Sequence, residues 1–189
     1  MKRVGILAIQ GDVEAHAAAL ARCGAEPVRV LHARELDALD GLVLPGGEST
    51  TISKGIARLA LAEPLRAFAR SGRPVLGTCA GAILLARGVR NHPVPTLGLL
   101  DATAVRNAYG TQVDSFAAPA DPGGALPGLR CVFIRAPRLE QLGPAVETLV
   151  RVDGAPVLVR EGGILAATFH PELTDDARVH ALVVEAAGA

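Results

Sequence analysis

Short apolar runs alternate with segments of helical periodicity through the first half of the chain, and this alternation is the strongest constraint on its fold. Strand-like runs occupy residues 4–9, 28–31, 42–44 and 74–77, and helix-like segments occupy residues 12–23, about 50 onward, 64–70 and 82–86. Strands that alternate with helices in this way form mostly parallel sheets that are covered on both faces. The pattern therefore predicts an α/β fold of three layers, with a mostly parallel central sheet between two layers of helices.

The second half of the chain contains more strand-like segments and fewer helices. Further strand-like runs lie at residues 97–105, 131–134, 146–152, 156–159 and 164–168, and the composition of residues 117–128 predicts a loop. A last helix, from about Asp175, places Val179, Leu182 and Val183 on one apolar face. Because no linker long enough to separate two domains is present, we expect residues 1–189 to form a single domain.

Charge and cysteine usage exclude several classes of function. The chain has 19 Lys and Arg residues against 19 Asp and Glu residues, so it lacks the positive excess that is typical of nucleic-acid-binding domains. The apolar run at residues 4–9 is too short for a membrane span or a signal peptide. Three widely spaced cysteines suggest neither a disulfide framework nor a zinc site. We therefore expect a cytoplasmic protein with no metal site, no nucleic-acid partner and no membrane contact.

The sharpest local signal is the segment Gly-Thr-Cys-Ala-Gly at residues 77–81, which lies directly between a predicted strand and a predicted helix. This is the arrangement of a nucleophile elbow, with Cys79 where a hydrolase would carry serine. Glycines at both ends let the chain turn tightly, and the start of a helix favours the thiolate form. By itself the segment fits a buried packing cysteine equally well. Cys23 and Cys131 have no such glycines, and we expect them to be packing residues.

A nucleophilic thiol needs a base, and His170 is the best candidate. It follows the predicted strand at residues 164–168, and Glu172 lies two residues later. On an extended segment held by Pro171, the two side chains would leave from the same side. A carboxylate in that place can accept a hydrogen bond from one imidazole nitrogen while the other nitrogen faces the thiol. The other histidines are expected on surface helices or in polar connections: His16, His180, His32 and His92.

Together these motifs resemble the class I, or triad, glutamine amidotransferases, in which the cysteine elbow is followed by His-x-Glu near the C-terminus. Further segments resemble, in order, the glutaminase subunits of pyridoxal phosphate synthase, and they lie at residues 10–12, 45–51, 106–110, 132–137 and 169–174. The resemblance implies a flavodoxin-like fold of the class I glutamine amidotransferase type, with one glutaminase domain over residues 1–189. It also implies hydrolysis of L-glutamine to L-glutamate and ammonia through a γ-glutamyl thioester, without a cofactor.

The resemblance also implies roles for individual residues. Cys79 would attack the carboxamide carbon of glutamine, with His170 as general base and then acid, and with Glu172 fixing the histidine tautomer. The backbone amides of Gly47 and Ala80 would form the oxyanion hole. The implied glutamine-binding residues are Gly47, Glu48, Ser49, Arg106, Ile134 and Arg135.

A partner is implied as well. Subunits of this family pass ammonia through a tunnel to a synthase with a (β/α)8 barrel, which assembles pyridoxal 5'-phosphate from a pentose phosphate and a triose phosphate. Gln10 and Gly11 follow the first predicted strand, at the edge of the sheet where the active sites of α/β proteins collect. We expect docking of the synthase to reorder this loop beside the oxyanion hole and to switch the activity on.

Two alternatives remain at this point. The chain could be the glutaminase subunit of another ammonia-using enzyme, such as imidazole glycerol phosphate synthase, although the segments at residues 47–50 and 133–137 tell against it. It could also be a non-catalytic assembly subunit or a redox-sensing subunit on the same scaffold. The presence of Cys79, His170 and Glu172 together argues against a silent role, because a purely structural protein needs no such set.

Overall fold

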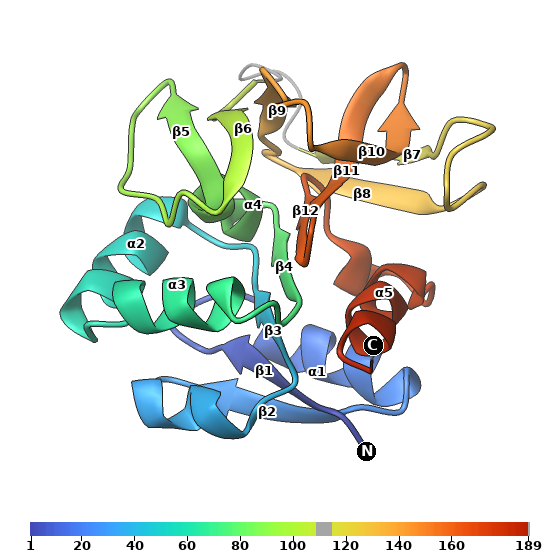
Figure 1. Ribbon diagram of the computed structural model, residues 1–189. Helices are drawn as coiled ribbons and strands as arrows, with labels where there is room; N and C mark the ends of the chain where they lie inside the picture. The colour runs from blue at the N-terminus through green and yellow to red at the C-terminus, as the bar shows by residue number, and fades with distance from the viewer. Residues whose placement is uncertain (109–114, 189) are drawn as a thin grey trace.

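A seven-stranded sheet forms the centre of the molecule in the computed structural model, which describes residues 1–108 and 115–188 (Figure 1). Its strands are β1 (Arg3–Leu7), β2 (Glu26–Val30), β3 (Gly41–Leu44), β4 (Val75–Thr78), β10 (Glu147–Val152), β11 (Ala155–Glu161) and β12 (Ile164–Ala167). The strand order is β10-β11-β12-β4-β3-β1-β2. The five strands from β12 to β2 are parallel. At one edge β11 pairs antiparallel with β12, and β10 pairs antiparallel with β11. The prediction of a mostly parallel sheet is confirmed.

Helices cover both faces of this sheet (Figure 1). One face carries α1 (Val13–Arg22) and α5 (Arg178–Ala186), and the other carries α2 (Ser49–Arg58), α3 (Ala62–Arg70) and α4 (Ala80–Leu85). The side chains of β3, β4 and β12 alternate between the two cores, as a period of two requires. In β3, Leu42 and Leu44 pack with the layer of α2 to α4, whereas Val43 packs with α1 and α5. The three predicted layers are therefore present.

Two smaller sheets lie at the top of the view in Figure 1. Three strands, β5 (Ala86–Arg90), β6 (Leu100–Val105) and β9 (Arg138–Glu140), form one sheet, and β7 (Ser115–Pro119) pairs with β8 (Arg130–Ile134) in the other. Two predictions fail here. Ala86 begins a strand instead of ending a helix, and the loop expected at residues 117–128 begins only after Pro119. A two-stranded sheet has only edge strands, and an edge tolerates proline.

The chain before the last helix is held in turns, so α5 begins at Arg178 and not near Asp175. Thr174 Oγ1 accepts a hydrogen bond from the Asp176 backbone N–H at 3.3 Å, and Asp176 Oδ1 accepts one from the Arg178 backbone N–H at 3.1 Å. Two short 3-10 helices are also present, η1 (Ala33–Ala38) and η2 (Pro171–Leu173). The second of these lies in the candidate site.

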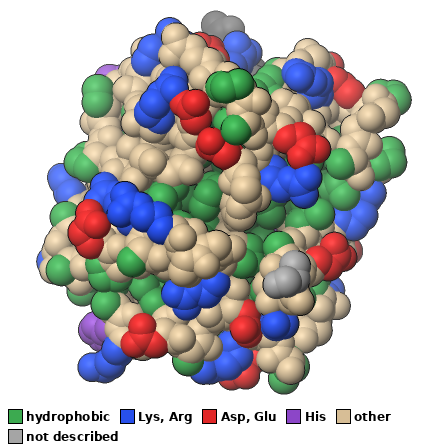
Figure 2. Space-filling view, in the orientation of Figure 1, with side chains coloured by type: hydrophobic (Ala, Val, Ile, Leu, Met, Phe, Trp, Pro, Cys, Tyr) green, Lys and Arg blue, Asp and Glu red, His purple; other side chains and the backbone are tan. Residues whose placement is uncertain are grey.

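The surface carries charges of both signs. On the face shown in Figure 2, Lys and Arg side chains are interspersed with Asp and Glu side chains, and neither sign gathers into one patch. Ion pairs such as Arg160 with Glu147 and Arg3 with Glu26 bring opposite charges together. Within residues 1–108 and 115–188, no helix is both long enough and apolar enough to cross a membrane.

Candidate active site

Four loops meet at one edge of the central sheet. The strands β12, β4, β3 and β1 are parallel neighbours, so the loops that follow them lie side by side. These loops carry His170 after β12, Cys79 after β4, Gly46 after β3 and Gln10 after β1. Candidate residues from both ends of the chain are thus brought to one place.

Cys79 occupies a tight turn between β4 and α4. Its φ of 48° and ψ of −103° lie outside the regions that non-glycine residues normally adopt, as expected for a strained nucleophile elbow. The glycines at both ends of the turn are required by packing. A Cβ on Gly77 would lie 2.5 Å from the carbonyl carbon of Gly81, and a Cβ on Gly81 would overlap the carbonyl oxygen of Leu44. The predicted strand-turn-helix geometry is confirmed.

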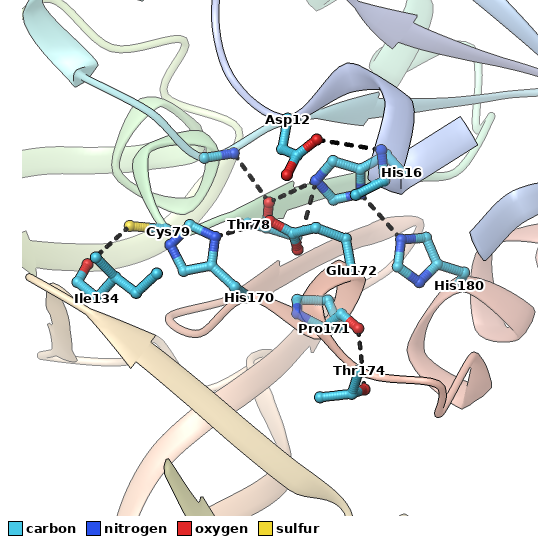
Figure 3. A network of polar contacts seen from close by, with 12 residues as sticks. Asp12, His16, Thr78, Cys79, Ile134, His170, Pro171, Glu172, Thr174 and His180 are labelled. Carbon is cyan, nitrogen blue, oxygen red and sulfur yellow. Dashed lines mark hydrogen bonds and ion pairs between the residues drawn. The ribbon is translucent and has the colours of Figure 1, made fainter. Parts of the chain in front are cut away.

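His170 and Glu172 contact each other through their side chains (Figure 3). His170 Nδ1 lies 2.7 Å from Glu172 Oε1, and the His170 backbone N–H donates to the Val132 carbonyl at 2.8 Å. The reason expected for this contact was wrong, because Pro171 begins the 3-10 helix η2 and the segment is not extended. The turn of η2, and not the period of a strand, brings the two side chains together.

Electrostatics favour a protonated imidazole beside a carboxylate. Burial alone would lower the pKa of His170, but hydrogen bonds with Cys79 and Glu172 raise it to about 10. Burial would raise the pKa of Glu172, but the hydrogen bond with His170 and the neighbouring His16 ring hold it below its ordinary value. His170 therefore keeps its proton at neutral pH, and Glu172 stays ionised.

Cys79 lines a pocket of about 360 Å³ at this edge of the sheet. Its side chain is buried, and Sγ lies 3.8 Å from the carbonyl oxygen of Ile134. The pocket is lined by Gln10, Gly47, Glu48, Ser49, Cys79, Ala80, Ile83, Arg106, Asn107, Ile134, Arg135 and His170. Every candidate from the sequence is in this set except Glu172, which contacts His170, and Gly11, which packs against Gly46.

Glu48 connects the pocket to the start of α2. Its carboxylate accepts hydrogen bonds from the backbone N–H groups of Thr50 and Thr51, so it caps the helix one residue earlier than the sequence suggested. Burial opposes ionisation, but hydrogen bonds from the Thr51 hydroxyl and from these two backbone amides lower the pKa of Glu48 to about 2. Glu48 is therefore a fixed negative charge at the pocket wall.

Two arginines supply the positive charge of the pocket. Arg106 Nη1 donates to the His92 carbonyl at 2.7 Å, and Arg106 Nη2 lies 3.5 Å from Glu48 Oε1. Arg135 has a φ of 44°, in the left-handed region that a side chain seldom adopts, next to the Ile134 carbonyl that faces Cys79. Residues 109 and 110 of the motif that begins at Arg106 lie outside the described residues.

Two buried histidines were missed by the sequence analysis. His16 on α1 and His180 on α5 were expected at the surface, but both are fully buried. His16 Nδ1 lies 2.9 Å from His180 Nε2, and His16 Nε2 lies 3.5 Å from Glu172 Oε2 (Figure 3). A signal was present for His16, because it lies three residues after Val13 and four before Leu20, on the same helix face.

The other two cysteines lie in the packing of the fold. Cys131 on β8 is fully buried, and burial raises its pKa to about 12. Cys23 closes α1, and burial raises its pKa as well. Both thiols therefore stay protonated at neutral pH, which disfavours a nucleophilic role. In the part of the chain that the structure describes, no group of three or more His, Cys, Asp or Glu side chains could hold a metal ion.

Comparison with known sequences agrees with this geometry. The family model of the SNO glutamine amidotransferases matches residues 6–188. A relative from Frankia casuarinae, named pyridoxal 5'-phosphate synthase subunit PdxT, is 57% identical over 186 residues, which is 97% of this chain and 94% of the relative. A relative of the same name from Thermotoga maritima is 47% identical over 184 residues, which is 97% of this chain and 98% of the relative.

Solved structures of other proteins have the same fold as this chain. A crystal structure of a glutamine amidotransferase superposes with a TM-score of 0.92 at 45% identity, covering 98% of this chain and 99% of that one. The structure of PurLQS from Thermotoga maritima has a TM-score of 0.72 at 18% identity, covering 98% of this chain and 99% of that one, and shares the fold alone. With the family model matched over nearly the whole sequence, the chain belongs to the SNO glutamine amidotransferase family.

Proposed function

We propose that this chain hydrolyses L-glutamine to L-glutamate and ammonia, as the glutaminase subunit of a pyridoxal 5'-phosphate synthase. One observation carries the proposal, namely the connected set of Cys79, His170 and Glu172 at a pocket with two arginines and a glutamate. The relatives that match over nearly their full length bear the name of that subunit, which supports the choice of synthase. The three free cysteines fit a reducing compartment, so we place the protein in the cytoplasm.

The protonation states define the order of the chemical steps. His170 acts first as the base and holds the proton of the Cys79 thiol. The thiolate then attacks the carboxamide carbon of glutamine, and the electron pair of the C=O double bond moves to the oxygen. When the intermediate collapses, the C–N bond breaks, and the His170 imidazolium gives its proton to the leaving nitrogen, which departs as ammonia. A γ-glutamyl thioester then remains on Cys79.

Hydrolysis of the thioester completes the cycle. Water attacks the thioester carbon, and His170, now neutral, takes a proton from the water. The C–S bond breaks, glutamate leaves, and the thiolate and imidazolium are restored. Glu172 stays ionised throughout and holds His170 through Nδ1, so that Nε2 faces the sulfur.

The tetrahedral intermediates need hydrogen-bond donors for their negative oxygen. We assign this role to the backbone amides of Gly47 and Ala80, which line the pocket with Cys79. Ala80 is in the first turn of α4, where N–H groups have no acceptor within the helix. Gly47 has a φ of 148°, a backbone conformation that favours glycine. Loss of one such donor typically costs about 10²- to 10³-fold in rate.

The amino-acid end of glutamine carries a carboxylate and an ammonium group. Arg106 and Arg135 are the proposed partners of the carboxylate, because a guanidinium group can bind it with two parallel hydrogen bonds. Glu48, the cap of α2, brings the negative charge that an ammonium group needs, and Ser49, the first residue of α2, lines the pocket beside it. Ile134 contributes its backbone next to Cys79.

The proposed partner is the (β/α)8-barrel synthase subunit, which would receive the ammonia. Gln10 Oε1 accepts a hydrogen bond from the Glu48 backbone N–H at 2.9 Å, and a Cβ on Gly11 would overlap the carbonyl oxygen of Gly46. The Gln10–Gly11 loop therefore supports the loop that carries the proposed oxyanion amide of Gly47. Docking that moves Gln10 would move this amide, which is the basis for activation by the partner.

A glutaminase assay with and without the synthase subunit tests this proposal. We expect glutamate release to depend on Cys79, to rise when the synthase is added, and to be lost in Cys79→Ala. Release by Cys79→Ala in the reconstituted complex would overturn the triad. Equal rates with and without the synthase would overturn gating, and co-purification with a synthase of a different product would support another ammonia-using complex.

A further inference from the structure

The buried histidines behind the triad have no part in the reaction steps above. His16 comes from α1 and His180 from α5, and both rings are fully buried. Neither lines the pocket, so neither contacts the substrate. Burial of polar rings is costly unless their nitrogens are hydrogen-bonded. His16 lies against the carboxylate that orients His170, and His180 lies against His16 (Figure 3), which suggests a function for the pair there.

Hydrogen bonding around Glu172 indicates which nitrogen of His16 carries the proton. Glu172 Oε1 accepts from His170 Nδ1 at 2.7 Å, whereas the buried Oε2 has no hydrogen-bond partner among the described residues. His16 Nε2 lies 3.5 Å from this oxygen. A proton on His16 Nε2 would face the negative charge of Glu172 Oε2, whereas a lone pair on Nε2 would face a lone pair of that oxygen. His16 is therefore assigned as the Nε2–H tautomer.

His180 is placed to fix this tautomer. With the proton of His16 on Nε2, His16 Nδ1 is an acceptor, and His180 Nε2–H donates to it at 2.9 Å. The opposite arrangement would leave an N–H on His180 Nδ1, a buried atom with no partner among the described residues. Burial lowers the pKa of His16, and burial together with His16 lowers the pKa of His180 to about 3, so both rings are neutral at pH 7.

The same ring also reaches the loop that carries the oxyanion amide. Thr78 Oγ1 lies 3.2 Å from His16 Nε2 and accepts a hydrogen bond from the Gly46 backbone N–H at 3.0 Å. Gly46 directly precedes Gly47. One buried imidazole therefore contacts the residue that orients the base and the residue that anchors the oxyanion loop.

We propose that His16 is a positioning residue for this active site. Its Nε2–H, held in that tautomer by His180, keeps the Glu172 carboxylate against His170 and, through Thr78, keeps the Gly46 loop in place. The inference rests on the proposed function, because it takes Glu172 to be a member of the triad. His16 acts through Glu172 and touches no reacting atom.

Two substitutions at His16 separate hydrogen bonding from packing. His16→Gln keeps an N–H near the position of Nε2, whereas His16→Leu fills a similar space without a donor. In the complex with synthase, we expect His16→Leu to lower the kcat for glutamine hydrolysis about tenfold or more, the size expected when a donor that faces a buried charge is removed. KM should stay near that of the wild type, because the pocket wall is unchanged. His16→Gln should recover most of the lost kcat.

The pH profile gives a readout that packing alone does not move. The titratable and charged groups around the pair are Glu172, His170 and Asp12 near His16, and Glu172 and Arg22 near His180. Losing the His16 donor raises the pKa of Glu172, so the acid limb of kcat should move to higher pH in His16→Leu and not in His16→Gln. An unmoved limb with wild-type kcat in His16→Leu would overturn the proposal.

Leu20→Ala is the matched control, since Leu20 is fully buried on the same helix and outside the polar network. It should lower the unfolding temperature and leave kcat and the acid limb unchanged. If it reproduces the kinetic effects of His16→Leu, His16 has only a structural role and the proposal fails. Glu172→Gln is measured in parallel, because full activity there would overturn the triad itself and this inference with it.

A measurement on the unsubstituted protein does not depend on the folding of any variant. Nitrogen-15 spectra of isotope-labelled protein, with the His16 ring signals assigned by correlation to the His16 backbone resonances, report which ring nitrogen is protonated. We expect His16 to carry its proton on Nε2 near neutral pH. A proton on Nδ1 instead would overturn the proposal.

Discussion

Replacement of Gly46 by alanine tests the contact between the proposed nucleophile and its base. A Cβ on Gly46 would lie 2.6 Å from Cε1 of His170 and 3.2 Å from the Cβ of Cys79, whereas ordinary contacts begin at 3.4 Å. The φ of Gly46 is not positive, so alanine meets no backbone strain there. The new methyl group therefore enters the space between Cys79 and His170 and acts on little else.

The size of the effect follows from these distances. To relieve the overlap, the imidazole must move by a large fraction of an ångström, and the 2.7 Å contact with Glu172 limits where it can go. A misplacement of about 1 Å costs roughly 10²-fold in rate, so we expect kcat/KM of Gly46→Ala to fall about 100-fold. Overpacking should cost only about 1–3 kcal/mol of unfolding free energy.

The assay is glutamate release in the presence of the synthase subunit, together with thermal unfolding of the free chain. Gly88→Ala is the matched control, because a Cβ on Gly88 in β5 would meet nothing within 4 Å. Gly88→Ala should keep the wild-type rate. If Gly46→Ala is folded and hydrolyses glutamine as fast as Gly88→Ala, the arrangement of Cys79 and His170 described above is wrong.

Three further predictions concern charge and packing. Burial lowers the pKa of His170, but Cys79 and Glu172 raise it to about 10. Glu172→Gln removes a negative partner of the imidazolium, so the alkaline limb of the kcat/KM profile should move to lower pH. An unmoved limb would contradict the effect of Glu172 on the pKa of His170. Arg106→Ala should raise KM for glutamine about tenfold in initial-rate assays, with a smaller change in kcat, and an unchanged KM would remove Arg106 from the substrate site. In Gly81→Ala the new Cβ would overlap the Leu44 carbonyl oxygen, so the free energy of unfolding should fall by at least about 1–3 kcal/mol, measured by thermal unfolding. A wild-type unfolding temperature would contradict the packing of the elbow at residues 77–81.

Much of the central sheet could be predicted because the hydrophobic period and the secondary structure agree there. The elbow at residues 77–81 was also visible, since two glycines at fixed spacing have a direct steric role. The small sheets were harder to foresee. The strand β5 pairs in parallel with β6, the next strand along the chain, and β6 pairs with the more distant β9. No local pattern specifies either pairing. Composition alone suggested a loop where β7 lies.

The polar layer behind the triad could not be predicted for a different reason. A histidine inside a helical pattern is ordinarily assigned to the surface, and its burial becomes favourable only with a polar partner. That partner for His16 is His180, on a helix at the other end of the chain. Sequence periodicity places His16 on the inner face of α1, but it does not indicate that α5 packs there. The contact of His170 with Glu172 likewise depends on the turn η2.

The most direct test of the central claim is to trap the covalent intermediate. The complex with synthase is quenched with acid during glutamine turnover, digested, and examined by peptide mass spectrometry. We expect a γ-glutamyl adduct on the peptide that contains Cys79, and none when Cys79→Ala is used. An adduct on Cys23 or Cys131, or glutamine turnover with no adduct on any cysteine, would contradict that claim.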